Sequence, residues 1–423
     1  MNEWREVSWG EIAQLRYGKG LRDYKEKTEG VPVFGTNGQV GYTDRPLCET
    51  DGVVIGRKGA YRGVHYSPNP FYVIDTAFWL EVSDEVHPRW AYFNLKTADI
   101  NGLDSGSAIP SLSRVDFDSL PCLLPEVLEQ RAIAHILGTL DDKIELNQKM
   151  NQTLEEIAKA IFKSWFVDFD PVRAKAEGRP TGLPPEISDL FPDELVDSEI
   201  GEIPKGWEVA KLAKICETTD YVANGSFSTL KENVSKVESF SGTEAMMLRF
   251  ADFNRGWAGD FSFVTHDSYE FLSKSKVFCG DIVICNVGEV GAVFRAPDLG
   301  FDMTLGPNGV LCKNFESGIG LKREYFYFYL SDKTFRSRIE AISSGSVQTK
   351  FNKTDFRNLD VLIPHHELLA VVDPIFEQVC QRLDLLFKEN RILSELRDTL
   401  LPKLISGELR IPDAEKFLEE AGI

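Results

Sequence analysis

Two positively charged residues between glycines are the side chains of this sequence whose type and spacing best suit the binding of a charged partner. Arg57 and Lys58 stand between Gly56 and Gly59. Glycine lets a backbone approach a large partner closely, and two positive charges on a turn suit the phosphates of a nucleic acid. An ordinary solvated turn would have the same composition, so both interpretations stay open for this pair.

Reading a base sequence in a DNA groove requires Asn, Gln, Arg and Lys on loops, with further polar groups on the phosphates. Candidates were chosen by that rule, and we expect most of them to be plain surface residues. The first half of the chain offers Asn37, Gln39 and Tyr42, then Arg57, Lys58, Tyr61 and Arg62, then Ser105, Ser107 and Arg114. The second half offers Arg249, Asn254 and Arg255 near Trp257, then Asn286, then Gln348, Lys350, Asn352 and Lys353.

Catalytic and metal-binding patterns are weak throughout the sequence. SPNPFY (67–72) has one proline after its asparagine, where adenine methyltransferases have two, and Gly35, Gly38 and Gly41 do not form a turn that leads into a helix. The 7 cysteines form no CxxC pair, which indicates neither zinc nor a disulfide framework and suits a reducing cytoplasm. We expect no catalytic residue and no metal ligand in this chain.

The candidate loops recur because the sequence repeats itself. SGSVQTKFNKTDFRNLDVLIP (344–364) matches SGSAIPSLSRVDFDSLPCLLP (105–125) at an offset of 239 residues. DIVICNVGEVGAVFRAP (281–297) matches GVVIGRKGAYRGVHYSP (52–68) at an offset of 229, so that Asn286 replaces Arg57. The same loop pattern with different side chains is what two readers of different base sequences would have.

Two long amphipathic helices follow the repeated loops, at 126–166 and 365–405. They match without a gap, and their apolar positions step by three and four, which predicts one buried stripe on each. Some 40 residues make a rod of roughly 60 Å, and the simplest way to bury both stripes is an antiparallel pair with an approximate two-fold axis. Pro374 predicts that the second helix either begins there or bends there.

Asn151 and Asn390 occupy matching positions near the middle of the two predicted helices. A buried polar residue in a coiled coil can fix the register and orientation of the helices. The alternative is an exposed asparagine beside the apolar stripe, and the sequence does not decide between the two.

The predicted fold class is α+β, with two strand-rich domains that are each followed by a long helix. We expect domains at 1–125 and 206–364, a helix with a Pro- and acid-rich linker at 126–205, and a second helix with a tail at 365–423. The net charge of −19 argues against nucleic acid at first. The strand-rich segments are close to neutral, however, with 13 basic and 17 acidic residues in 1–125 and 18 and 20 in 206–364. No apolar run approaches the ~20 residues of a membrane span.

In four stretches, LEQRAIAHILGTLDDKIELNQ (128–148), FVDFDPVRAKAEGRPTGL (166–183), DSEIGEIPKGWEV (197–209) and LRDTLLPKLISGELRI (396–411), the chain resembles the specificity subunit of type I restriction–modification systems. VFGTNGQVGY (33–42) and VVIGRKGAYRGV (53–64) are similar to target-recognition domains of that family. The resemblance implies two domains that each read one half of a split, asymmetric DNA target, with the helices setting the unread gap between the halves.

The resemblance also implies a non-catalytic, cytoplasmic chain that binds double-stranded DNA and no cofactor. Its partners would be two modification subunits, which are adenine methyltransferases using S-adenosylmethionine, and two motor-nuclease restriction subunits using ATP and Mg²⁺. The remaining alternative is a repeat-built scaffold that clamps other proteins and binds DNA weakly or not at all. Salt dependence of DNA binding separates the two, because only a DNA reader loses affinity steeply with salt.

Overall fold

The computed structural model of the chain consists of two compact units. It describes residues 4–59, 61–103, 111–257, 259, 261–315, 321–345 and 349–420. Unit 1 comprises Met1–Leu146 together with Asn390–Ile423, and unit 2 comprises Asn147–Glu389. Both ends of the chain therefore belong to the same unit.

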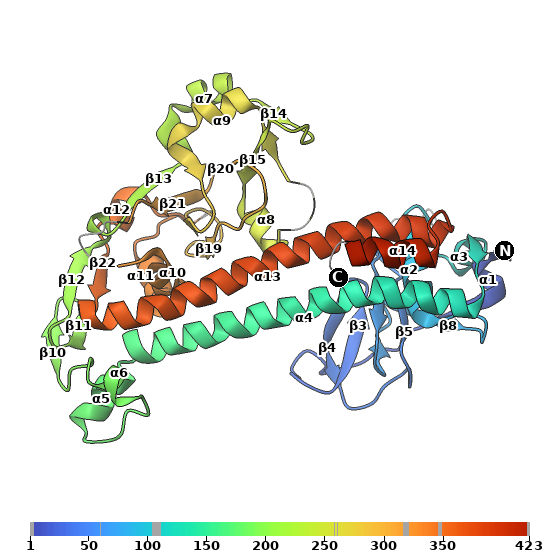
Figure 1. The fold of residues 1–423 in the computed structure, drawn as a ribbon, viewed down its shortest axis with the longest axis horizontal. Coiled ribbons are helices and arrows are strands. Elements are labelled where there is room, and N and C mark those ends of the chain that lie inside the picture. The colour runs from blue at the N-terminus through green and yellow to red at the C-terminus, as the bar shows by residue number, and fades with distance from the viewer. Residues whose placement is uncertain are drawn as a thin grey trace. The chain divides into compact units, whose positions relative to one another are not determined.

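Unit 1 is built on two small sheets (Figure 1). The first is antiparallel, in the order β2 (Ala13–Tyr17), β8 (Ala77–Val82), β5 (Gly52–Gly56) and β6 (Val64–Ser67). The second has the order β4 (Gly38–Thr43), β3 (Val31–Gly35) and β7 (Tyr72–Val73), with β3 and β7 parallel. The remaining elements before the long helix are β1 (Arg5–Ser8), which pairs with β9 (Pro121–Leu124), and the helices α1 (Trp9–Ile12), α2 (Pro88–Thr97) and α3 (Arg114–Asp118).

Unit 2 repeats this plan with more elements. An antiparallel sheet has the order β13 (Glu217–Asp220), β21 (Gly309–Lys313), β18 (Ile282–Cys285) and β19 (Val293–Arg295). A second sheet has the order β14 (Lys236–Val237), β16 (Phe263–Val264), β15 (Ala245–Leu248), β20 (Met303–Leu305) and β17 (Lys276–Val277). β12 (Glu208–Lys211) pairs with β22 (Asp360–Ile363) as β1 pairs with β9 in unit 1.

The helices of unit 2 are mostly short. They are α5 (Asp170–Ala176), α6 (Pro185–Ser188), α7 (Phe227–Asn233), α8 (Phe250–Asn254), α9 (His266–Phe271), α10 (Arg323–Ser331), α11 (Lys333–Ala341) and α12 (Lys353–Arg357), with 3-10 turns at Leu212–Lys214, Tyr221–Asn224 and Ser273–Ser275. The segment at 167–205, which the sequence predicted to be a Pro- and acid-rich linker, contains α5, α6 and the hairpin of β10 (Leu195–Ser198) with β11 (Gly201–Pro204).

Two long helices contribute to both units, α4 (Val127–Phe166) and α13 (His366–Ser406), and α14 (Ile411–Glu420) ends the described chain (Figure 1). In unit 1 the beginning of α4 and the end of α13 share a core that includes Leu140 and Leu400. In unit 2 the end of α4 and the beginning of α13 meet, where the ring centroids of Phe162 and Phe376 are 6.1 Å apart. The helices are therefore antiparallel within each unit, and the predicted α+β fold class is confirmed.

Pro374 does not begin the second helix, because α13 starts at His366. Proline lacks the N–H that would bond to a carbonyl four residues earlier.

The residue before Pro374, Asp373, is buried. Burial is the main cause that raises the pKa of its carboxyl to about 6, and the nearby Glu324 and Glu377 also raise it.

Candidate nucleic-acid interface

In unit 1 the hairpin between β5 and β6 is joined by its backbone to the segment that begins at Ser111. The Arg57 N–H donates to the carbonyl of Thr76 at 3.0 Å, and the Arg57 carbonyl accepts from the N–H of Leu112 at 2.9 Å. An isolated β-bridge links Lys58 to Ser111. The structure thus brings the neighbouring residues Arg57 and Lys58 close to the segment that leads into Arg114, more than 50 residues later in the sequence.

Arg57 and Arg114 both lie over the ring of one exposed tyrosine, Tyr17. The Arg57 guanidinium carbon lies 5.0 Å from the centroid of the Tyr17 ring, and that of Arg114 lies 4.2 Å from it. Tyr17 remains 50% exposed, and a guanidinium held over an aromatic face gains cation–π attraction. Sequence analysis missed Tyr17. Gly18, the next residue, was the available signal, because a glycine can mark a close approach of two backbones. In the structure a Cβ at Gly18 would lie 2.0 Å from the Ile74 carbonyl oxygen.

The turn between β3 and β4 lies against the same hairpin. Thr36 Oγ1 donates to the Thr76 carbonyl at 2.7 Å, the same carbonyl that accepts from Arg57. Asn37 and Gln39, on this turn and at the start of β4, are exposed. Tyr42, further along β4, is half-buried, and its N–H donates to the Tyr24 carbonyl at 3.0 Å.

Arg62 is buried, so the structure does not give it the surface position expected of a DNA contact. It is 2% exposed, and its guanidinium donates to the carbonyls of Ile100 at 3.2 Å, Asn101 at 2.6 Å and Gly59 at 3.2 Å. It therefore fastens residues 100 and 101 to the hairpin. Its neighbour Tyr61 is 68% exposed.

Unit 2 repeats this set of backbone contacts, called the backbone frame below, and Val287, Lys350 and Phe351 fall at the expected offsets of 229 and 239 residues. The Asn286 N–H donates to Asn308 at 3.1 Å, and the Asn286 carbonyl accepts from Phe351 at 3.3 Å. A β-bridge joins Val287 to Lys350, at the positions of Lys58 and Ser111. The predicted correspondence of the loops is therefore present in their hydrogen bonds.

Acidic residues hold several of the candidates in unit 2. Arg249 and Arg255 both pair with the buried carboxylate of Asp252, at 2.6 and 2.8 Å. Asn254 Nδ2 donates to Glu289 on the hairpin at 3.2 Å, which joins α8 to the Asn286 loop.

The segment that enters α12 has two further fixed side chains. Lys353 pairs with Asp220 at 2.7 Å. Asn352 caps α12, because its Oδ1 accepts from the N–H of Asp355 at 2.8 Å, as Ser113 accepts from Asp116 in unit 1. Lys350 is exposed. Ser105, Ser107 and Gln348 lie outside the described residues.

The two asparagines proposed to set the helix register are each partly buried. The Oδ1 atoms of Asn151, in unit 2, and Asn390, in unit 1, are shielded and have no hydrogen-bond partner among the described residues. Their role in register stays a prediction.

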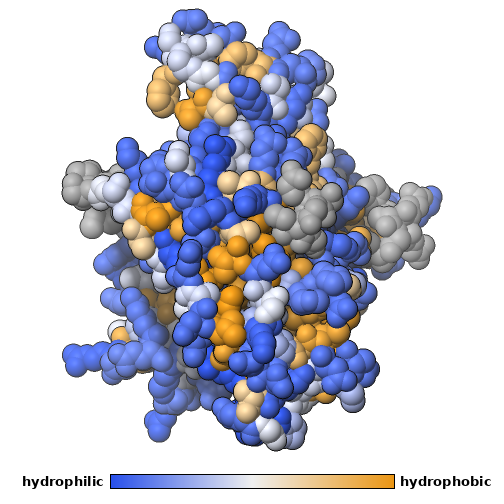
Figure 2. Space-filling model, turned by 90° about the vertical axis from the view of Figure 1, so that its left-hand side faces the viewer, coloured by the Kyte–Doolittle hydropathy of each residue, from blue (hydrophilic) through white to orange (hydrophobic). Residues whose placement is uncertain are grey.

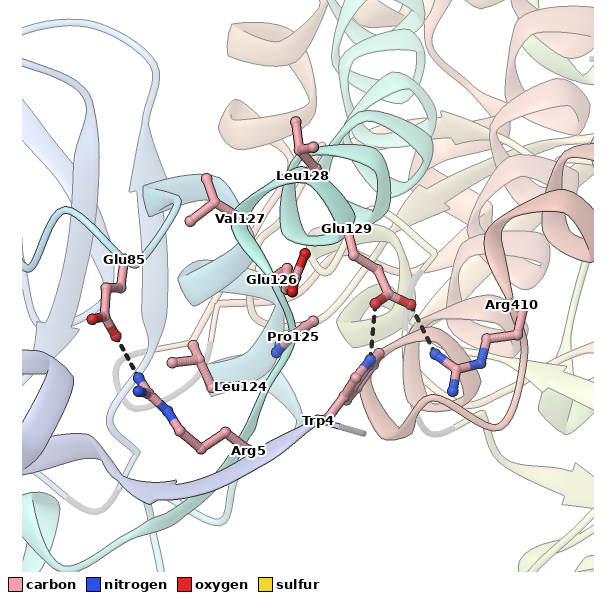
Figure 3. Close-up of a pocket in the computed structure, with 10 residues that line it drawn as sticks. All are labelled: Trp4, Arg5, Glu85, Leu124, Pro125, Glu126, Val127, Leu128, Glu129 and Arg410. Carbon is pink, nitrogen blue, oxygen red and sulfur yellow. Dashed lines mark hydrogen bonds and ion pairs between the residues drawn. The ribbon is translucent and has the colours of Figure 1, made fainter. Parts of the chain in front are cut away.

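A cavity of about 960 Å³ lies in unit 1 at the beginning of α4 (Figure 3), and the described residues that line it include none of the candidate DNA contacts. Glu129 closes one side of it, accepting from Trp4 Nε1 at 3.0 Å and pairing with Arg410 at 2.9 Å. Figure 3 shows Leu128 pointing away from this pair, and its side chain is 75% exposed. The contacts of Glu129 tie the first and last segments of the chain together within unit 1.

Most of the surface in view in Figure 2 is hydrophilic, with hydrophobic residues gathered in a few patches. Among the helices that the structure describes, none is long and apolar enough to cross a membrane. No group of three or more His, Cys, Asp or Glu among the described residues is placed to hold a metal ion.

Comparison with known proteins finds similar sequences among the specificity subunits of type I restriction enzymes. Residues 1–156 match the family described as type I restriction modification DNA specificity domain. The HindI type I restriction enzyme specificity subunit of Haemophilus influenzae is 27% identical over 406 residues, covering 80% of this chain and 81% of that one. The MjaIX specificity subunit of Methanocaldococcus jannaschii is 25% identical over 349 residues, covering 78% and 71%. The chain is therefore similar to type I specificity subunits over most of its length.

The fold of this chain is also similar to that of a solved specificity subunit. The crystal structure of the S subunit of a type I restriction–modification system from M. genitalium has a TM-score of 0.59 with 18% identity, and the match covers 95% of this chain and 96% of that one. The resemblance stated from the sequence is therefore confirmed. The matching family model is described as a DNA specificity domain, so the loops described above are the natural place to look for DNA contacts.

Proposed function

We propose that this chain reads a bipartite, asymmetric DNA target with two recognition domains, one in each unit. The repeated frame supports this proposal most directly, because equivalent backbone hydrogen bonds position Arg57 in one unit and Asn286 in the other. A guanidinium and an amide read different base edges, so two such domains would select different half-sites. The two long helices would set the unread gap between them.

The chain would act without catalysis of its own and would direct adenine methylation and restriction by partner subunits. Two modification subunits with S-adenosylmethionine and two motor-nuclease subunits with ATP and Mg²⁺ would complete the assembly. We place this activity in the cytoplasm, where a bacterial or archaeal chromosome and incoming DNA are accessible. This chain itself would bind no cofactor.

A genome-wide map of N6-methyladenine, with and without this chain in cells that express the partner methyltransferase, tests the proposal. We expect a split motif with a fixed gap only when the chain is present. Exchanging residues 344–353 for those of a relative should alter one half of the motif and leave the other unchanged. Unchanged methylation, with the chain still bound to its partners, would support the scaffold alternative instead.

A further inference from the structure

The two units differ in charge at positions where their frames coincide. Tyr17 ends β2 and Asp220 ends β13, 203 residues later. The same offset relates Trp9 to Leu212, whose N–H groups donate at 2.9 Å to Leu120 and Leu359 respectively. Tyr17 and Asp220 are therefore equivalent.

In unit 1 the equivalent positions carry three positive charges. Arg57 donates to the Asp75 carbonyl at 3.0 Å, and both Arg57 and Arg114 lie over Tyr17. Lys58 is exposed beside them. None of these three cations forms an ion pair with a carboxylate in the part of the chain that the structure describes. The net charge of the equivalent positions 17, 57, 58, 111 and 114 is +3, from two arginines and one lysine.

In unit 2 the same positions carry less charge. Asn286 and Val287 replace Arg57 and Lys58, and Asp220 replaces the tyrosine. The Lys353 ammonium lies 2.7 Å from the Asp220 carboxylate, and the two side chains are only 25% and 11% exposed. Lys350 and Lys353 together with Asp220 give +2 − 1, a local charge of +1.

We propose that unit 1 supplies most of the electrostatic attraction to the DNA phosphates. Tyr17 holds Arg57 and Arg114 against the phosphates of the half-site that unit 1 reads. Unit 2 then reads its half-site with little net attraction to the backbone. This inference rests on the proposed DNA-reading function and adds to it an inequality between the half-sites. Tyr17 is a positioning residue here, because it acts through the two guanidinium groups.

The difference between the two units can be measured from the salt dependence of DNA binding. Each phosphate neutralised by a cation contributes about 0.9 to the slope of log affinity against log salt. Three contacts in unit 1 would contribute about 2.7 to that slope, and one in unit 2 about 0.9. Between 50 and 200 mM salt, each contact then weakens binding about 3.5-fold.

The test uses the full chain in complex with its methyltransferase subunits and a fluorescent duplex that carries the mapped target. Affinity is measured from 50 to 300 mM salt for four variants. Tyr17→Asp gives unit 1 the acid of unit 2, and we expect it to reduce the slope by about 1 to 2. Asp220→Asn keeps an acceptor for the Ala223 N–H but releases Lys353, and should steepen the slope by about 1. Tyr17→Phe keeps the ring, and Lys27→Ala removes a charge paired with Asp44. Neither control should change the slope.

The possible outcomes separate this inference from the proposed function. If the unaltered complex binds no DNA in a salt-dependent way, the proposed function fails. If it binds, but Tyr17→Asp and Asp220→Asn leave the slope unchanged, the inequality between the units is refuted while the proposed function stands. The steeper slope expected for Asp220→Asn cannot come from a folding defect, because a misfolded unit would only lose contacts with DNA.

Discussion

Arg62 shows how a residue chosen for one task can perform another. A guanidinium between glycine-rich turns fits a DNA contact by composition, yet its hydrogen bonds run to carbonyls of its own domain. Asn352 is similar, because its amide oxygen caps α12. Residue type predicted that these side chains would donate or accept hydrogen bonds. It could not predict the partners, which depend on backbone brought close from 39 residues away for Arg62 and Asn101.

Replacing Arg62 by methionine should lower the free energy of unfolding of unit 1 by about 2 to 4 kcal/mol, because several buried carbonyls lose their donor. DNA affinity should fall as well, with an unchanged salt slope, since this charge does not face the phosphates. Urea unfolding and DNA titration of the same preparations would check both. Tyr61→Ala is the matched control, since that exposed neighbour should leave stability within about 0.5 kcal/mol.

Asp373 predicts a pH dependence of stability. Its folded pKa of about 6 lies above the ordinary value of 3.8. The folded state therefore holds the proton more tightly, and this group's contribution to stability falls as pH rises from about 4 to 6. Asp373→Asn should raise stability at pH 7 by about 1 to 3 kcal/mol and flatten the curve between those values. Thermal melts of both proteins from pH 4 to 8 measure it, and parallel curves would contradict the assignment.

The long helices were the elements that the sequence predicted best. The expected ranges 126–166 and 365–405 compare with Val127–Phe166 and His366–Ser406. The regular spacing of apolar residues is a local property of the sequence, so it predicts a long helix without knowledge of the surface against which the helix packs. The β10–β11 hairpin at 195–204 and helices α5 and α6 were missed, because such short elements depend on neighbours for burial. The internal repeat predicted which candidate loops of the two units are equivalent. It could not predict the contacts that the side chains of these loops make.

The division of α13 between two cores gives a prediction at the element scale. Leu400 is 1% exposed in the unit 1 core and Leu368 is 0% exposed in the main unit 2 core. Each truncation to alanine should cost about 2 to 5 kcal/mol, but in different units. Hydrogen exchange followed by unit should show Leu400→Ala loosening unit 1 and Leu368→Ala loosening unit 2. Equal loosening of both units by either variant would contradict the division.

At the scale of the whole molecule, the four segments predicted from the sequence follow chain order, whereas the compact units do not. Unit 1 takes its last 34 residues from Asn390–Ile423. Composition and repeats place boundaries along a chain, but they do not show which distant segments share a core. The predicted segment boundaries stay a prediction.

Removing residues 390–423 should therefore damage the first domain rather than the second. Leu393, Leu396, Leu400 and Leu404 would leave the unit 1 core together. We expect the chain that ends at Glu389 to lose protection from proteolysis in residues 4–146 and to keep it in residues 206–363. Limited proteolysis with mass spectrometry would decide this, and preferential cleavage of the second region would contradict it.

The contacts of Glu129 have a consequence for synthesis on the ribosome. Its partner Arg410 is 281 residues further along the chain. Domains normally fold in the order in which they emerge. Here all of unit 2 is translated before the last part of unit 1, so the first strands to emerge must wait for the final helix. At 5–20 residues per second, that wait is roughly 15 to 60 seconds. A nascent chain stalled before residue 390 should thus carry a finished second domain and an unfinished first one.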